Sequence, residues 1–316
     1  MAMKLIRFSA LLLTLSLLLS ALISCGNNAA PSGNESTADS TEAPTSEAAT
    51  EPPVLADPVD PLFAKIVEKM KADPNYVIFI IGDSVTQGSG ASDPVRLDYT
   101  AKFAEKLAKQ IPEKSVYRVD GSPRGDYLGI AYPHPNKFVP VQRSGEDKIT
   151  VVRCGIGGNT VQKIIDREHD YINKQIDGHT GDLFIIMSGI NDFDAGSYDL
   201  TKYASPPKYK ANLNTLVRMI KDAHPDSDII LMTPTTVGKD GKGLDIYAKQ
   251  VIDVGAAEGI AVSDQHKLWM DHYTEGAPNY GQGDWLKDGD SCHPTDIGHE
   301  AIADEMIHAL FGVQPQ

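Results

Sequence analysis

Residues 77–90 read VIFIIGDSVTQGSG, an apolar run that ends at Gly82 and gives way at once to Asp83 and Ser84. Five consecutive apolar residues bounded by a glycine indicate a short strand that is buried on both faces. Such strands occur in parallel sheets that helices cover on both sides. The hydroxyl of Ser84 is therefore predicted at the carboxyl end of a buried strand, which is where open α/β sheets bind their ligands.

Short apolar runs alternate with amphipathic segments along the rest of the chain. The segment Tyr209–Ala223, and a last segment that carries Ile302, Met306 and Leu310, have apolar residues at helical spacing. This alternation predicts an α/β fold with a parallel, doubly wound sheet of about five strands. The predicted strands are Tyr76–Ile81, Lys148–Cys154, Asp182–Met187, Asp228–Met232 and Gly259–Val262.

The size and charge of the chain limit the classes of function. Its 316 residues, 41% of them hydrophobic, suffice for one sizeable domain. A formal net charge of −14 argues against a nucleic-acid partner, because binding to a phosphate backbone requires a basic surface. Apart from Cys25, the chain has two cysteines, Cys154 and Cys292, which we expect to be free, half-buried thiols.

The first 57 residues are expected to lie outside the folded domain. Residues 1–25 have the cationic start and apolar run of a secretory signal peptide. They end in Leu22-Ile-Ser-Cys25, which resembles a bacterial lipobox with Cys25 as the lipid anchor; the alternative is an ordinary cleaved signal. Residues 26–57, rich in Ser, Thr, Ala, Pro and Glu, predict a disordered tether. The sequence thus predicts a domain over residues 58–316 at the extracellular face of a bacterial envelope, touching the membrane only through its anchor.

A long connection interrupts the alternation of strands and helices. Residues 115–147 are rich in Gly, Pro and Tyr and are too many for a plain link between a helix and a strand. We therefore expect an insertion here, with a β-hairpin as one candidate structure, over the active edge of the sheet.

Two further strand ends carry residues suited to stabilising an oxyanion. One is followed by Gly155-Ile-Gly-Gly-Asn-Thr160, where glycines let backbone N–H groups approach a ligand closely. The next is followed by Ser188-Gly-Ile-Asn191-Asp192, and an asparagine amide there donates a hydrogen bond without adding charge. With the N–H of Ser84, these groups would point donors at a developing oxyanion. Each alone is typical of a turn, but three at successive strand ends indicate a site.

A serine nucleophile needs a base, and the C-terminal part of the chain offers one. Asp290-Ser-Cys-His293 precedes Pro294, which disfavours helical geometry at His293 and predicts a loop. Asp290 can bind one imidazole nitrogen and fix the tautomer while the other nitrogen faces Ser84. The alternative is a surface Asp and His in an acidic loop.

Two other patterns suggest different chemistry but are incomplete. Ser205-Pro-Pro-Lys208 has the S-x-x-K spacing of penicillin-recognising enzymes, yet without their other motifs it indicates the start of a helix. His293, Asp296 and His299 would form a poorly spaced metal site, so His299 is expected to be an ordinary helix residue.

Together, four motifs resemble those of the SGNH/GDSL hydrolase family, in the family's order and over residues 76 to about 310. They are Gly82-Asp-Ser84, Gly158-Asn-Thr160, Gly189-x-Asn191-Asp192 and Asp290-x-x-His293. The resemblance implies a flavodoxin-like three-layer α/β/α sandwich. Val85 replaces the family's usual leucine, and the insertion at 115–147 is unusually long.

The resemblance also implies a role for each motif. Ser84 would be the nucleophile, His293 the base and Asp290 the acid that orients it. The oxyanion hole would consist of the N–H groups of Ser84 and Gly158 and the side chain of Asn191. This chemistry requires no metal or organic cofactor.

The expected activity is that of an extracellular serine esterase that removes O-acetyl groups from carbohydrates through an acyl-enzyme, since a tethered enzyme suits polymers that cannot enter a cell. The alternatives are a lipase, lysophospholipase or thioesterase acting on acyl lipids, and a non-catalytic glycan-binding lipoprotein. Aromatic residues could stack on sugar rings or equally pack loops onto the body. They are Tyr127, Tyr132, Phe138, Tyr273, Tyr280 and Trp285.

Overall fold

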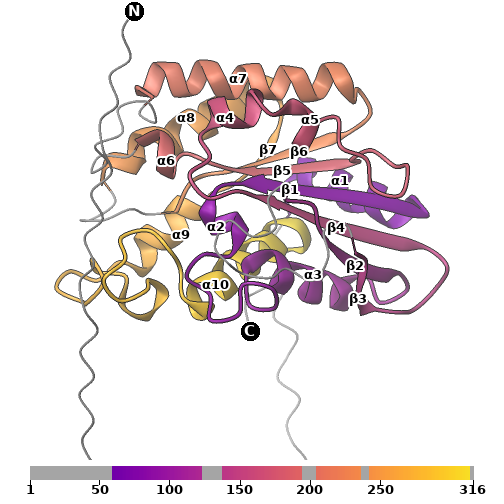
Figure 1. Ribbon diagram of the computed structural model, residues 1–316, viewed down its shortest axis with the longest axis horizontal. Helices are drawn as coiled ribbons and strands as arrows, with labels where there is room; N and C mark the ends of the chain where they lie inside the picture. Colours follow the sequence, from indigo (N-terminus) through magenta and orange to yellow (C-terminus); the bar gives the residue numbers. More distant parts are fainter. Residues whose placement is uncertain (1–58, 123–136, 194–203, 236–241, 314–316) are drawn as a thin grey trace, which may run out of the picture. The chain divides into compact units, whose positions relative to one another are not determined.

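The computed structural model describes residues 59–122, 137–193, 204–235 and 242–313. Within them, one seven-stranded sheet has the order β3-β2-β4-β1-β5-β6-β7 (Figure 1). All neighbouring pairs are parallel except β2 and β3. The strands are β1 (Asn75–Gly82), β2 (Ser115–Asp120), β3 (Val139–Gln142), β4 (Lys148–Gly155), β5 (Leu183–Met187), β6 (Asp228–Met232) and β7 (Ala261–Ser263).

Helices cover both faces of the sheet, as Figure 1 shows. On one face α1, α3 and α10 pack together, and on the other α7 packs against α4 and α8. This arrangement confirms the predicted three-layer α/β/α fold. The helices are α1 (Pro61–Ala72), α2 (Ser84–Gln87), α3 (Tyr99–Gln110), α4 (Val161–Ile165), α5 (Glu168–Tyr171), α6 (Ile190–Phe193), α7 (Pro206–Ala223), α8 (Lys242–Glu258), α9 (Gln265–His272) and α10 (Asp296–Phe311), with one 3-10 turn, η1 (Gly283–Trp285).

The sheet has two more strands than the sequence predicts, and both come from residues 115–147. All five predicted strands are present, but β2 runs parallel to β4 and belongs to the sheet proper, so the extra material begins only after it. β3 pairs antiparallel with β2, as in the hairpin considered for this stretch. Pro140 in β3 cannot donate a ladder hydrogen bond, which suits its place at the edge of the sheet.

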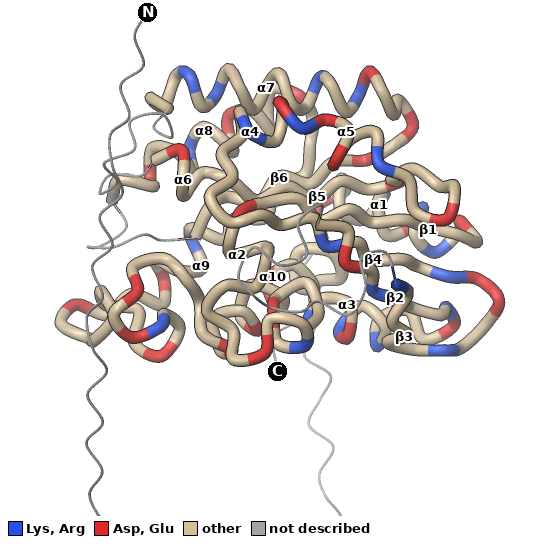
Figure 2. Tube along the Cα trace, in the orientation of Figure 1, with Lys and Arg blue, Asp and Glu red and all other residues tan. Residues whose placement is uncertain are grey.

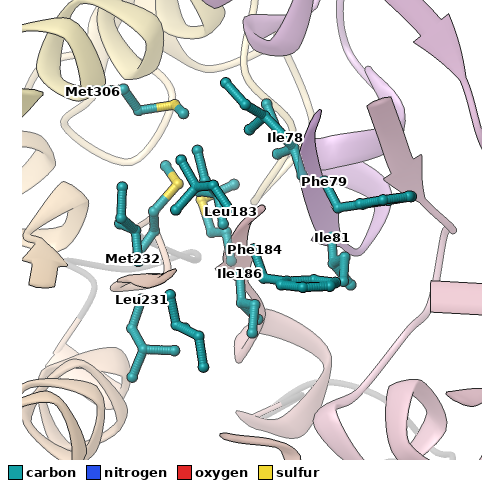
Figure 3. Packing of buried hydrophobic residues seen from close by; sticks show 14 of the residues in the cluster. Ile78, Phe79, Ile81, Leu183, Phe184, Ile186, Leu231, Met232 and Met306 are labelled. Atoms are coloured by element: carbon teal, nitrogen blue, oxygen red, sulfur yellow. The ribbon is translucent and has the colours of Figure 1, made fainter. Parts of the chain in front are cut away.

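The core contains apolar side chains of the strands and of the helices that cover them; Figure 3 shows those of β1, β5 and β6 with Met306 of α10. Phe79 of β1 lies opposite Phe184 of β5, and their rings stack with centroids 5.7 Å apart. Met306 of α10 packs on the other face of the sheet. Continuous burial of β1 and β5 on both faces explains why their sequences are uninterrupted apolar runs.

The predicted signal peptide, Cys25 and the tether lie outside the described residues. Among those that are described, no helix has both the length and the apolar character needed to cross a bilayer.

Two glycines let the central strand ends approach α2 closely. A Cβ on Gly82 would lie 2.0 Å from Thr86 Oγ1, and one on Gly155 would lie 2.2 Å from the backbone nitrogen of Gln87. Any larger residue at either position would push α2, and with it Ser84, away from the sheet.

We predict that Gly155→Ala destabilises the fold by roughly 2–3 kcal/mol, because its methyl group would overlap backbone atoms that cannot yield. Gly259→Ala is the control. Its Cβ would meet no atom within 4 Å, and only its left-handed backbone (φ +63) should cost about 1 kcal/mol. Urea denaturation of both variants measures the difference; equal losses would contradict this account of Gly155.

Candidate active site

Ser84 is the first residue of the short helix α2, directly after β1. The carboxylate of Asp83 accepts a hydrogen bond from the backbone nitrogen of Val85 at 3.0 Å and so caps this helix. Asp83 and Val85 are buried, whereas Ser84 is half-exposed. The turn therefore holds a rigid backbone inside the protein while presenting one hydroxyl at the carboxyl edge of the sheet.

The structure brings Ser84, His293 and Asp290 together. Nε2 of His293 lies 2.8 Å from Ser84 Oγ, and its Nδ1 lies 2.7 Å from Asp290 Oδ2. A carboxylate can only accept, so Nδ1 carries the ring proton and Nε2 has a free lone pair that accepts from the serine hydroxyl. In this arrangement His293 can remove a proton from Ser84.

Asp290 is held in place by its own turn. Its Oδ1 accepts from the backbone nitrogens of Cys292 and His293 at 3.0 and 3.1 Å. Partial burial alone would raise the pKa of Asp290, but these backbone bonds and the His293 ring outweigh it and lower the pKa. Asp290 therefore stays ionised and keeps the orientation of the imidazole fixed.

The loop after α2 is tied to the start of α10, which follows His293. Ser92 donates from its nitrogen and hydroxyl to the carboxylate of Asp296 at 2.7 and 2.5 Å. The buried ring of His299 accepts from Tyr99 N at 3.3 Å and donates to Ser89 O at 3.1 Å. Both nitrogens of His299 are thus used on backbone groups, so it acts as a structural helix residue, as expected, rather than as a metal ligand.

The glycine loop after β4 is fastened beside Ser84 by buried amides. Gln87 of α2 accepts from Gly157 N at 2.8 Å, and Asn159 donates to Gly82 O at 3.1 Å. Gly158 between them has φ +75, and the space around its Cα is open. A Cβ built at this position would meet no atom within 4 Å.

Asn191 lies in α6, which follows β5, and its amide is oriented by the same loop. Its Nδ2 donates one hydrogen bond, to Asn159 O at 2.9 Å. An amide nitrogen has two hydrogens, so the second is available to a ligand. The side chain is half-exposed.

Two buried acids, Asp83 and Asp192, lie beneath these groups, and sequence reasoning gave them no role. Burial raises the pKa of Asp192 to about 7, and the charge of Asp83 adds to this effect. Burial also raises the pKa of Asp83 to about 6. Asp192 accepts from the backbone nitrogen of Val161 at 3.1 Å and so binds the start of α4. Both acids thus organise helix starts around the site at an electrostatic cost.

Arg153 is a second feature that sequence reasoning missed. It is 2% exposed, and its guanidinium donates to Gln87 O at 3.2 Å and Pro94 O at 2.6 Å and pairs with Asp120 at 3.0 Å. An arginine inside the apolar run of β4 was the available sign, because a buried charge needs partners. Arg153 fixes the far end of α2 and the loop behind Ser84.

The remaining candidates have structural surroundings. Trp285 stacks on His272 with centroids 3.7 Å apart, and Phe138 packs edge-on against Tyr117. Ser205 is the N-cap of α7, whose first two residues are prolines, as expected. Tyr127 and Tyr132 lie outside the described residues. Both cysteines are free, as predicted; Cys292 is half-buried, but the expectation of a half-buried thiol was wrong for Cys154, which is fully buried at the end of the central strand β4.

A comparison with known protein families identifies the family of the chain. Residues 80–301 match the GDSL-like Lipase/Acylhydrolase family, and the chain belongs to that family. The comparison with curated proteins gave no match.

Several solved structures share the fold at low sequence identity. Axe2, an acetylxylan esterase from Geobacillus stearothermophilus, is 22% identical, with a TM-score of 0.54 over 78% of this chain and 100% of that one. The acetyl xylan esterase AlAXEase is 17% identical, with a TM-score of 0.53 over 74% and 100%. The lipase/acylhydrolase from Enterococcus faecalis is 18% identical, with a TM-score of 0.51 over 76% and 99%.

The raised pKa of Asp192 predicts an inverted pH effect on stability. Between about pH 4 and 7 the folded chain keeps a proton on Asp192 that an unfolded aspartate has lost, so the free energy of unfolding falls as pH rises through this window. Asp192→Asn removes this term, so its stability relative to wild type should rise by up to roughly 1.4 kcal/mol per pH unit and level off above pH 7.

Urea denaturation at pH 5, 6, 7 and 8 measures this difference. The control is Asp222→Asn, on the exposed side of α7, whose difference from wild type should stay constant. A pH-independent difference for Asp192→Asn would contradict the protonated state.

Proposed function

We propose that the protein is a serine esterase that works through an acyl-enzyme. The observation that carries this proposal is the contact between His293 Nε2 and Ser84 Oγ, with His293 Nδ1 held by Asp290. His293 takes the hydroxyl proton as Ser84 attacks the ester carbonyl, and then returns it to the departing alcohol. Water, activated by the same imidazole, hydrolyses the acyl-enzyme and restores Ser84.

The tetrahedral intermediate needs donors for its oxyanion. We assign this role to the backbone N–H groups of Ser84 and Gly158 and to the free amide hydrogen of Asn191. The Asn159 carbonyl aims Asn191, and Gln87 and Asn159 anchor the loop that carries Gly158. Donors held in place before the reaction cost no reorganisation when the charge develops, and each is worth on the order of 3 kcal/mol.

The proposed substrates are O-acetylated carbohydrates. Support comes from the two acetylxylan esterases that share the fold, and from the expected anchor at Cys25, which would hold the domain outside the cell near polymers. Of the aromatic residues considered for sugar stacking, Tyr280 is 42% exposed, whereas Trp285 and Phe138 pack against other rings. Tyr280 is therefore our candidate for contact with a sugar ring.

Acyl lipids are the second candidate class of substrate. The Enterococcus faecalis lipase/acylhydrolase has the same fold, and a lipid-anchored enzyme would lie beside a membrane. A non-catalytic glycan-binding lipoprotein fits less well, because binding alone does not require a base hydrogen-bonded to a serine.

Acetate release from a panel of acetylated xylan, mannan and pectin tests the proposal. Wild type should release acetate from at least one of them, and Ser84→Ala should lower the rate by roughly 10⁴-fold or more without loss of fold. Ser144→Ala, on the exposed loop after β3, is the matched control and should keep full activity. In parallel assays, preference for octanoyl over acetyl aryl esters would favour lipids, and glycan binding without hydrolysis would reject an esterase.

The oxyanion assignment predicts a particular kinetic defect for Asn191. Asn191→Ala should lower kcat by about 10²–10³-fold with little change in KM, because the lost bond forms only in the transition state. Asn191→Asp should lose at least as much, since a carboxylate repels the oxyanion. Exposed Asn173→Ala is the control. A change confined to KM would place Asn191 in substrate binding instead.

A further inference from the structure

One group in the loop between α9 and α10, which contains Asp290 and His293, has no part in the proposed reaction. The thiol of Cys292 lies beside the acid and the base, with Sγ 3.6 Å from Asp290 Oδ1 and 3.8 Å from His293 Nδ1. Ligand atoms of the three residues all lie within 4.8 Å of one another, and within the described part of the chain this is the only cluster of its kind. We propose that Asp290, Cys292 and His293 form an inhibitory site for a borderline-soft divalent cation such as Zn²⁺.

The spacing of the three ligand atoms suits such an ion. Zinc bonds of about 2.3 Å to sulfur and about 2.0–2.2 Å to nitrogen and oxygen, at tetrahedral angles, separate sulfur from the other two ligands by about 3.5 Å. The observed separations of 3.6 and 3.8 Å need little adjustment. Sulfur is near Asp290 Oδ1, whereas His293 Nδ1 lies 2.7 Å from the other carboxylate oxygen, Oδ2. The carboxylate therefore has to turn to offer one oxygen to the ion, its hydrogen bond to Nδ1 is given up, and solvent completes the coordination.

The surroundings also favour a cation. The side chains of Asp290 and His293 are 27% and 26% exposed, so an ion can reach them from solvent. Burial raises the pKa of the Cys292 thiol, and the negative charges of Asp290 and Asp83, which raise it further, also attract a cation. The loop between α9 and α10 carries four acids and one lysine, and Figure 2 shows its acidic segments.

Binding would switch off the base through its tautomer. The metal takes the lone pair of Nδ1, so the proton that Nδ1 donated to Asp290 moves through solvent to Nε2. The Cys292 thiol loses its proton to solvent, giving one released proton per ion and a neutral site of one dication, one thiolate and one carboxylate. Nε2–H can then only donate to Ser84 Oγ, and the serine has no proton acceptor.

The test combines inhibition with a spectrum that needs no activity. Zn²⁺ should inhibit hydrolysis of an aryl acetate by the full chain, and chelation should reverse it. Cys292→Ala, measured against its own metal-free rate, should need at least tenfold more Zn²⁺ for half inhibition, whereas Cys154→Ala should respond like wild type. Co²⁺ should give a thiolate-to-cobalt charge-transfer band in wild type and Ser84→Ala but not in Cys292→Ala.

The outcomes separate this inference from the proposed function. Equal Zn²⁺ sensitivity of wild type and Cys292→Ala, or no cobalt band that depends on Cys292, overturns the metal site. Wild-type protein that lacks esterase activity yet shows the Cys292-dependent band retains the site and rejects the esterase.

Discussion

The hydrogen bond between Ser84 and His293 joins residues 209 positions apart, and the chemistry proposed here depends on it. A single bond of this kind contributes only about 1 kcal/mol net, so it cannot hold two segments together by itself. Helices α3 and α10 hold these segments together, because they pack against each other and share ion pairs such as Lys106 with Asp304 at 2.7 Å. The Ser92–Asp296 and Ser89–His299 contacts then fix the ends nearest the site. The packing of α3 against α10 therefore positions His293, and the hydrogen bond to Ser84 is a consequence of that position.

Two aspartates are buried close to the proposed site, although burial disfavours their ionised forms. Asp83 and Asp192 are each almost completely buried, and their raised pKa values express the cost. What they gain is a backbone N–H partner at the start of a short helix, α2 for Asp83 and α4 for Asp192. The attraction between Asp83 and His293 lowers the pKa of Asp83 in part.

The fold and the candidate residues Ser84, Asp290 and His293 could be identified from sequence because each leaves a local pattern. The apolar runs of β1 and β5 are continuous since both faces of these strands are covered. Asp290 and His293 lie three residues apart in a segment that Pro294 marks as a loop, because it disfavours helical geometry at His293. β2 and β3 were not predicted as strands of the main sheet, and a β-hairpin was only one candidate structure for residues 115–147. SVYRVD is short and polar at several positions, and VPVQ has only four residues, one of them proline, at the edge of the sheet. For such short segments intrinsic strand propensity is weak and pairing decides. The partners of Arg153 and the burial of Asp192 depend on which loops converge, which no local pattern encodes.

Aromatic residues anchor the loop between α9 and α10. Trp285 lies against His272 and meets the buried Trp269 edge-on, while its carbonyl accepts from Thr295 N at 2.9 Å. Lys287 N in turn donates to His293 O at 3.1 Å. The loop is thus anchored on one side to α9 and on the other to the segment that contains His293. Because Asp290 and His293 lie in a loop rather than in a helix or strand, this anchoring supplies the rigidity that the proposed role of His293 as a base requires. Sequence could not divide the aromatic residues between packing and recognition, because that division depends on which ring faces the body.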